Sequence, residues 1–159
     1  MTLFFGKYRG TVQENIDPYL AGRLQVTAPA ALGDAVVWAM PCSPFAGPGV
    51  GLYALPPVGA NVWVEFEGGN PEAAIWSGCF WDRGDFPPGV PRVLKVVLKT
   101  KNATVTLDDT PGAGGVTIEI AGKKITLSAT SISIDDGAGG TVTLQGPKVS
   151  INGSALEVT

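Results

Sequence analysis

Histidine is absent from the 159-residue sequence, and that absence removes several classes of function. No Ser-His-Asp triad, Cys-His pair or histidine-bearing zinc or iron site is available. The chain has 11 basic against 14 acidic residues and a formal charge of −3. This balance argues against binding to nucleic-acid phosphates, which requires clustered lysine and arginine. We therefore expect a protein that is not an enzyme, holds no cofactor or metal and does not bind nucleic acid.

Long apolar runs are also missing. Nowhere do about 18 apolar residues follow one another, as a membrane-spanning helix requires, and no basic region followed by an apolar stretch stands at the start. We expect a chain made in the cytoplasm. Only two cysteines are present, Cys42 and Cys79, far apart and without CxxC spacing. We expect reduced, buried thiols, and a disulfide only if the fold brings the two together.

Aromatic residues are confined to the first half of the chain. All four tryptophans, three tyrosines and six phenylalanines lie within residues 1–86, and residues 92–159 contain none. Between the two parts the sequence DRGDFPPGVP at 82–91 is rich in proline and glycine, which disfavour regular structure. We therefore predict a first domain at 1–81, a linker at 82–92 and a second domain at 93–159.

The first domain has the pattern of a small β-barrel. Val62, Val64 and Phe66 alternate with Trp63 and other outward positions, which is typical of a strand with one buried face. Proline- and glycine-rich turns separate the candidate strands. Five or six short strands in about 80 residues suit a closed or partly open barrel of the OB type. The candidate strands are Phe4 to Gln13, Arg23 to Thr27, Ala35 to Met40, Val62 to Glu67 and Ala74 to Trp81.

The second domain is a repeat. Apolar residues recur in pairs at alternate positions, seven or eight residues apart, and the pattern settles into an offset of 24 residues that contains three strands. This period predicts a β-helix in which three strands complete one lap. The pairs are Val105 and Leu107, Ile118 and Ile120, Ile125 and Leu127, Ile132 and Ile134, Val142 and Leu144, Val149 and Ile151, and Leu156 and Val158.

These paired residues need a partner. They are valine, isoleucine and leucine without aromatics, and about 65 residues of such strand cannot bury a core alone. If three identical chains wind together, the pairs fill a shared triangular interior. The sequence therefore predicts a homotrimer whose core and interface are formed by the residues of the seven pairs, in a rigid rod on the order of 35–40 Å long.

An ordered set of motifs resembles a known family. The motifs are FGKYRG at 5–10, GRLQV at 22–26, PCSPFAG at 41–47, LPPVG at 55–59, VWVEFEGGNP at 62–71 and IWSGCFW at 75–81. They resemble the OB-fold domain of phage baseplate assembly protein V and the VgrG spike proteins, and the repeat is similar to their trimeric β-helix. The resemblance implies an all-β chain, with an N-terminal OB-fold barrel followed by a C-terminal intertwined triple-stranded β-helix.

The resemblance also implies a function and partners. It implies the structural central spike of a contractile injection machine: a phage tail, a tailocin, an extracellular injection system or a type VI-like system. Three chains would form a membrane-piercing needle, attached through the OB domains to a separate hub protein and delivered to the target-cell envelope. No lysozyme domain or iron-binding histidine pair is present, so a blunt tip at Leu156, Glu157, Val158 and Thr159 would face a PAAR-type tip protein.

Other motifs favour plainer interpretations. GPGVG at 47–51 lacks the lysine and hydroxyl residue of a phosphate-binding loop. Arg83-Gly84-Asp85 matches an integrin-binding tripeptide, which we interpret as linker. Ser43 and Ser77 have no base to activate them.

Asp108-Asp109 and Asp135-Asp136 precede glycine-rich loops, and we interpret them as strand-ending turn residues rather than a calcium site.

Two alternative functions remain open at this stage. The runner-up function is an acidic OB-fold module that binds oligosaccharide or nucleic acid. A weaker alternative is a cell-surface adhesin.

Overall fold

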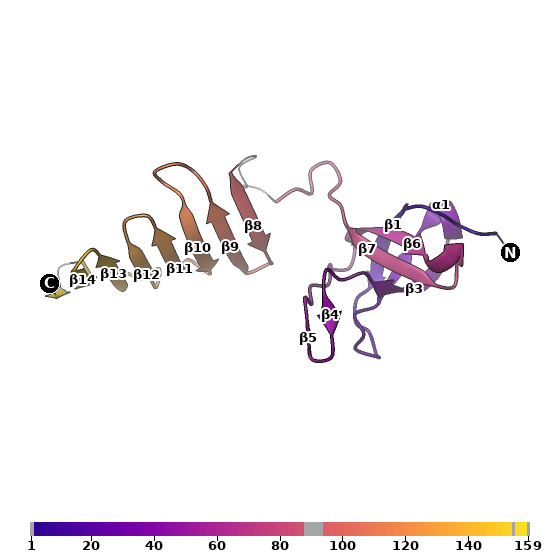
Figure 1. Cartoon of the computed structure of the whole chain (residues 1–159), viewed down its shortest axis with the longest axis horizontal. Helices are drawn as coiled ribbons and strands as arrows, with labels where there is room; N and C mark the ends of the chain where they lie inside the picture. The colour runs from indigo at the N-terminus through magenta and orange to yellow at the C-terminus, as the bar shows by residue number, and fades with distance from the viewer. Residues whose placement is uncertain (1, 88–93, 154, 159) are drawn as a thin grey trace. The chain divides into compact units, whose positions relative to one another are not determined.

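The computed structural model describes residues 2–87, 94–153 and 155–158 (Figure 1). The chain divides into two compact units, Met1–Phe86 and Pro87–Thr159. Both are β-rich, and the four-residue α1 (Pro29–Leu32) is the one α-helix in the described residues. Of the predicted linker 82–92, residues 88–92 lie outside the described part of the chain.

The first unit contains a closed five-stranded barrel with strand order β1-β2-β3-β7-β6. Neighbouring strands pair antiparallel except β3 and β7, which are parallel. Each of the five segments predicted as strands overlaps one of these strands, and the OB-type barrel is confirmed. The strands are β1 (Tyr8–Glu14), β2 (Leu24–Thr27), β3 (Val36–Pro41), β6 (Asn61–Phe66) and β7 (Ala74–Cys79).

The barrel core is mostly aliphatic and is buried from solvent. Val62 and Val64 are 0 % exposed and Phe66 only 7 %, so the predicted inward row of β6 is confirmed. Trp76 is also buried, and its indole Nε1 donates a hydrogen bond to the carbonyl oxygen of Gly22 at 3.2 Å. At Gly10 a side chain would overlap the backbone oxygen of Thr27, which explains a glycine inside a strand.

The second unit is one eight-stranded sheet in which each strand lies beside its sequence neighbours, so the order is β8 to β15 without a crossover (Figure 1). All pairs are antiparallel. The strands are β8 (Lys95–Lys99), β9 (Ala103–Asp108), β10 (Gly115–Ile120), β11 (Lys123–Ser128), β12 (Ile132–Asp135), β13 (Thr141–Gln145), β14 (Lys148–Ile151) and β15 (Leu156–Val158).

The all-β class, the N-terminal barrel and the β-rich C-terminal part are therefore as predicted, but the path of the strands within one chain differs from the predicted three-strand lap. Tight turns fold each strand back onto the one before it. Between β10 and β11, Ala121 and Gly122 have φ values of 50° and 81°, as the two central residues of a type I′ hairpin turn require. The 24-residue period is thus compatible with a meander, because alternation sets strand faces but not strand partners.

Two further strands form a separate arm in the first unit. β4 (Ala46–Gly47) and β5 (Val50–Gly51) pair only with each other, antiparallel. The arm belongs to the segment between β3 and β6 and stands away from the barrel strands (Figure 1).

Candidate assembly surfaces

One face of the C-terminal sheet carries two apolar rows that cross all eight strands. Residues two apart in a strand lie on the same face, and the in-register pairing aligns them across the sheet. The first row is Leu98, Val105, Ile118, Ile125, Ile134, Val142, Ile151 and Leu156. The second row of positions is Val96, Leu107, Val116, Leu127, Ile132, Leu144, Val149 and Val158.

The structure brings together almost all of the predicted interface residues. Ile120 is the exception: it lies on the same face but beyond the two rows, opposite Ala103 and Lys123. The rows also contain three residues that the sequence analysis missed, Val96, Leu98 and Val116. Their signal was present, because each stands two positions from another apolar residue in its strand. That these rows form the trimer interface stays a prediction.

In the single chain this apolar face has no cover. Its leucines and isoleucines and Val96 are 38 % (Ile151) to 67 % (Leu98) exposed and its other described valines are half-buried, whereas no residue of the barrel core is more than 8 % exposed. Contiguous exposed apolar surface of this kind marks an interaction site in soluble proteins. The single sheet is therefore an incomplete structure that requires a partner on this face.

The opposite face carries a row of hydroxyl side chains. Cross-strand hydroxyl neighbours of this kind contribute to sheet stability, and they give the sheet one apolar and one polar side. The sequence analysis noted polar residues between the apolar pairs, but only the pairing register shows that they align. The row is Thr106, Thr117, Thr126, Ser133, Thr143 and Ser150.

An ion pair joins the first two strands of the sheet. The Lys95 ammonium lies 2.7 Å from the Asp108 carboxylate, which also accepts hydrogen bonds from the backbone N–H and the hydroxyl of Thr110. These contacts, the one with Lys95 being the strongest, lower the pKa of Asp108 to about 2.

Three of the four aspartates in the two pairs bind turn residues, as predicted. Asp108 binds the turn at Thr110, Asp135 accepts from the N–H of Gly137, and Asp136 accepts from the N–H groups of Ala138 and Gly140. These are Asx-type turns that end a strand. Among the described residues no group of three or more His, Cys, Asp or Glu side chains could hold a metal ion.

The predicted tip residues lie at the last strand. Leu156 is 54 % exposed, and β15 pairs with β14 along one edge only. Glu157 and Val158 belong to β15, and Thr159 lies outside the described residues. That this end faces a partner stays a prediction.

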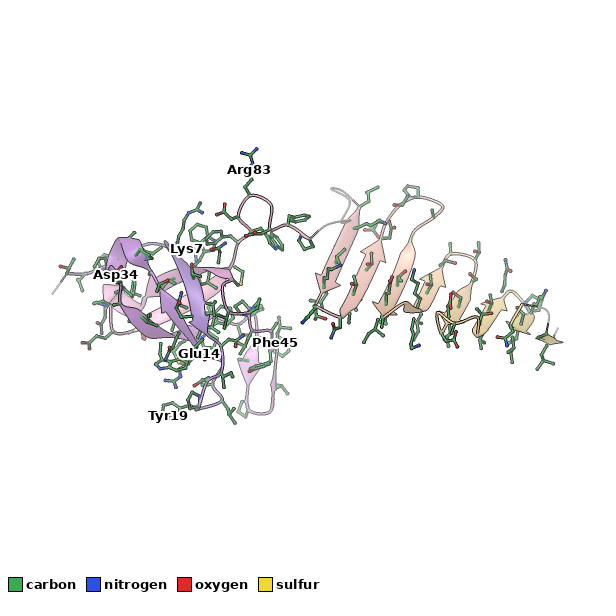
Figure 2. All side chains as sticks on the ribbon, turned by 180° about the vertical axis from the view of Figure 1, so that it is seen from behind. Lys7, Glu14, Tyr19, Asp34, Phe45 and Arg83 are labelled. Atoms are coloured by element: carbon green, nitrogen blue, oxygen red, sulfur yellow. The ribbon has the colours of Figure 1, made fainter. Side chains whose placement is uncertain are left out.

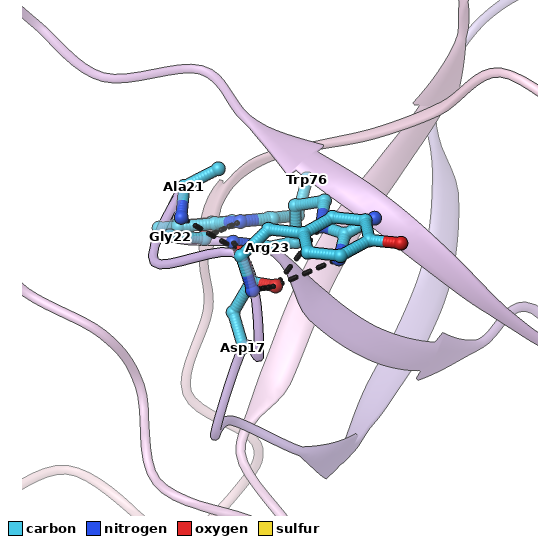
Figure 3. A network of polar contacts seen from close by, with 6 residues as sticks. Asp17, Ala21, Gly22, Arg23 and Trp76 are labelled. Carbon is cyan, nitrogen blue, oxygen red and sulfur yellow. Dashed lines mark hydrogen bonds and ion pairs between the residues drawn. The ribbon is translucent and has the colours of Figure 1, made fainter.

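In the barrel, Asp17 organises the loop between β1 and β2 (Figure 3). Its carboxylate accepts hydrogen bonds from the backbone N–H groups of Tyr19, Ala21 and Arg23 and from the Arg23 guanidinium at 2.8 and 3.1 Å. Asp17 is only 6 % exposed, and the Arg23 contact holds the pKa of its carboxyl far below the usual range. The Arg23 guanidinium also stacks on the rings of Tyr19 and Trp38, at 4.3 and 4.7 Å from the centroids.

The loop fixed in this way presents apolar side chains to solvent. Ile16, Tyr19 and Leu20 are 75 %, 78 % and 91 % exposed. Figure 2 shows Tyr19 at the outer end of the loop. The sequence analysis did not single out these residues, because isolated apolar residues in a turn carry no periodic signal.

The structure corrects the prediction of buried thiols. Cys42 and Cys79 are both free and both exposed. Cys42 lies just after β3 in the segment that leads to the arm, and Cys79 is the last residue of β7, opposite Val62. Cysteine is usually buried, but both residues occur where a strand leaves the barrel wall.

The remaining motifs take structural roles. Ser43 Oγ donates to the carbonyl oxygen of Phe45 at 2.9 Å, and Ser77 Oγ accepts from Lys7 Nζ at 2.8 Å. In the tripeptide Arg83-Gly84-Asp85, the Asp85 carboxylate accepts from the N–H of Asp82 and closes a turn. Within the described residues no helix is long and apolar enough to cross a membrane.

Comparison with known families assigns each of the two units to a domain family. Residues 8–81 match the injector OB domain of type VI secretion systems and phage baseplates. Residues 95–157 match the C-terminal trimerisation domain of phage baseplate V. The chain belongs to the baseplate V and VgrG-like spike proteins.

Membership of this family indicates the role of the chain and of its apolar C-terminal face. The members of these families are structural baseplate components, and the apolar face of β8 to β15 lies within the trimerisation domain. The family places the chain in a phage tail or injection system and supports a homotrimer. A comparison with curated proteins gave no match.

Proposed function

We propose that three copies of this chain form the central needle of a contractile injection machine. The observation that carries the proposal is the pair of uninterrupted apolar rows on one face of the C-terminal sheet. Three such faces turned toward a common axis bury all the rows at once and leave the hydroxyl rows outside. The residues of the rows, with Ile120 beside them, form the needle core and the trimer interface.

The sheet supplies the stiffness that a needle needs. Strands β9 to β14 each have hydrogen-bonded neighbours on both edges, so no backbone edge opens along the length of the sheet. Eight strands spaced about 4.8 Å apart span on the order of 35 Å. Bending such a prism strains both the ladder and the close-packed interior. The needle transmits the force of contraction to a target membrane and works as a mechanical part, without a catalytic step.

The two ends of the assembly bind different partners. The OB barrels fasten the needle to a separate hub protein, and the strand end at Leu156 to Thr159 meets a PAAR-type tip protein. The open edge of β15 supports the second contact, because an unpaired strand edge is a template for another protein. The complex is assembled in the cytoplasm and delivered to the envelope of the target cell.

The test uses particles purified from cells that produce the machine. Ile134 and Ser133 are neighbours in β12 on opposite faces, which makes Ile134→Asp and Ser133→Asp matched variants. Ile134→Asp buries a charge in the apolar interior, so particles carrying it lack the chain and do not penetrate target cells. Ser133→Asp places the charge outside, and its particles retain three copies per baseplate. Two results would refute the proposal: particles that carry Ile134→Asp and still penetrate target cells, or particles from wild-type cells that do not contain this chain.

A further inference from the structure

A groove of about 550 Å³ is lined by both the loop that Asp17 fixes and the β4–β5 arm. The loop contributes Ala21 and Gly22 to the lining, the arm contributes Val50, and β7 contributes Trp76. All of these residues belong to the first unit, so the groove is one concave surface of a single barrel. Its volume is in the range of sites that bind a ligand or a short peptide segment.

The groove carries no charge. None of the described residues that line it is Asp, Glu, Lys or Arg, although residues 1–86 contain eight acidic and four basic residues. A charged occupant would lose its hydration there without gaining an ionic partner. Phe45, Val50 and Tyr53, in the arm and beside it, are more than half exposed and remain in water until a partner covers them. The occupant of the groove is therefore apolar and uncharged.

The arm offers backbone hydrogen bonds as well as apolar surface. β4 and β5 pair only with each other, so each has one strand edge without a partner, and isolated hairpins are at best marginally stable in water. The base of the arm is nevertheless fixed, because the carbonyl oxygen of Phe45 accepts from Ser43 Oγ at 2.9 Å and from the N–H of Leu52 at 3.1 Å. A fixed and open strand edge is the feature to which an extended peptide adds as a further strand.

Gly47 marks the place where another backbone approaches the arm. Its φ lies outside the left-handed region, and an added Cβ would meet only the side chain of Val50, at 3.4 Å, which is an ordinary contact. Neither conformation nor packing within this chain therefore requires a glycine here. Glycine weakens a strand, and one use of it there is to let a second backbone come close.

We propose that the groove and the arm bind an extended, uncharged peptide segment of another baseplate protein, which adds a strand to the open edge of β4 at Gly47. The backbone of the segment pairs with the arm, and its apolar side chains enter the groove. This inference rests on the proposed attachment of the barrels to a hub protein, and it adds the surface that is used and the kind of segment that is recognised.

The variant Gly47→Val tests the contact in particles purified from cells that produce the machine. Valine favours strands, so the free variant keeps the trimer mass of the wild-type chain by light scattering. Its side chain blocks the approach of a second backbone, and we expect at least about tenfold fewer copies per particle. The matched control is Ala35→Val, at an exposed site that follows Asp34. Figure 2 shows Asp34 on a different side of the barrel from Phe45, and the control variant keeps the wild-type copy number.

The reactivity of Cys42 is a second measurement, made with the natural glycine in place. Cys42 is exposed and lines the groove. In a Cys79→Ser background, we expect its thiol to react with N-ethylmaleimide in the free trimer and at least about tenfold more slowly in the assembled particle. Asp34→Cys in a Cys42→Ser, Cys79→Ser background measures the general loss of access on assembly.

A photo-cross-link identifies the occupant. With p-benzoylphenylalanine in place of Val50, irradiated particles yield an adduct whose attached peptide is sequenced by mass spectrometry. An uncharged segment of another baseplate protein supports the proposal. An adduct to a second copy of this chain, to a charged segment or to no protein overturns it.

The outcomes separate this contact from the needle itself. A normal copy number of Gly47→Val in particles overturns the contact and leaves the needle intact. The same conclusion follows if Cys42 loses no more reactivity on assembly than the Asp34→Cys thiol. If Gly47→Val does not form trimers, the Cys42 rates decide. Particles from wild-type cells without this chain overturn both the contact and the proposed function.

Discussion

The carboxylate of Asp17 and the guanidinium of Arg23 meet in a two-pronged contact, with Oδ1 3.1 Å from Nε and 2.8 Å from the terminal nitrogen. The same carboxylate accepts three backbone N–H groups of its loop. These hydrogen bonds fix the conformation of the loop between β1 and β2, although the loop contains no regular secondary structure. The exposed position of Leu20 follows from this network.

Asp17→Asn is expected to destabilise the barrel. The amide keeps the shape but loses the negative charge and one acceptor oxygen, so the Arg23 guanidinium is left without its ionic partner. We expect the midpoint of thermal unfolding to fall by about 5 °C or more, measured by circular dichroism. Asp34→Asn, at an exposed site, is the matched control and leaves the midpoint unchanged. Equal midpoints for the two variants would contradict the role of Asp17.

The ion pair at Asp108 predicts a contribution to acid sensitivity. Its pKa is lowered from 3.8 to about 2 by Lys95 and Thr110, so its stabilising effect is complete above about pH 4. The effect is lost as the pH falls from 3.8 toward 2, because the protonated carboxyl no longer binds Lys95 in this way. Denaturant unfolding at pH 7 and pH 3 tests this. Asp108→Asn lowers stability at pH 7 and reduces the difference between the two pH values, and an unchanged difference would count against the pair.

The apolar rows predict a difference between neighbouring residues of β11. Ile125 lies opposite Ile118 and Ile134, whereas Thr126 lies in the hydroxyl row of the other face. Ile125→Asp places an unpaired charge among apolar side chains and abolishes the trimer. Thr126→Asp leaves the trimer intact. Light scattering on a sizing column measures both, and a trimeric Ile125→Asp chain would show that the rows are not the interface.

The barrel core predicts the cost of a small cavity. Val64 is 0 % exposed and Val58, in the loop before β6, is 58 % exposed. Val64→Ala is expected to lower the free energy of unfolding by about 1.5–3 kcal/mol, from lost burial and an unfilled space. Val58→Ala changes it by less than about 0.5 kcal/mol. Urea denaturation gives both values, and similar losses in the two variants would contradict the placement of the core.

Much of this fold could be predicted from local pattern. Alternation at Val62, Val64 and Phe66 identified a strand and its buried face, and the absence of aromatics after residue 91 separated the two units. The strand partners in the second unit could not be read in the same way, because hairpins and laps share the same alternation. One signal was overlooked: Asn152-Gly153 is a preferred hairpin turn, and φ is 49° at Asn152.

The candidate surfaces could likewise be predicted only in part. Most of the apolar rows could be found in the sequence, since their members recur at fixed spacing. The exposed loop could not, because its shape depends on hydrogen bonds that the Asp17 carboxylate accepts from residues as far along the chain as Arg23. Cys42 and Cys79 were predicted to be buried because cysteine is usually a buried residue type. The residue type does not tell whether the strand has already left the barrel wall at that position.

The mass of the chain in solution tests the central claim most directly. Light scattering on a sizing column is independent of molecular shape, and three chains of 16.4 kDa make 49.2 kDa together. The account predicts a single species of about 49 kDa that persists on dilution. A monomer of 16.4 kDa would contradict it, because the apolar face of β8 to β15 would then remain in water with no partner.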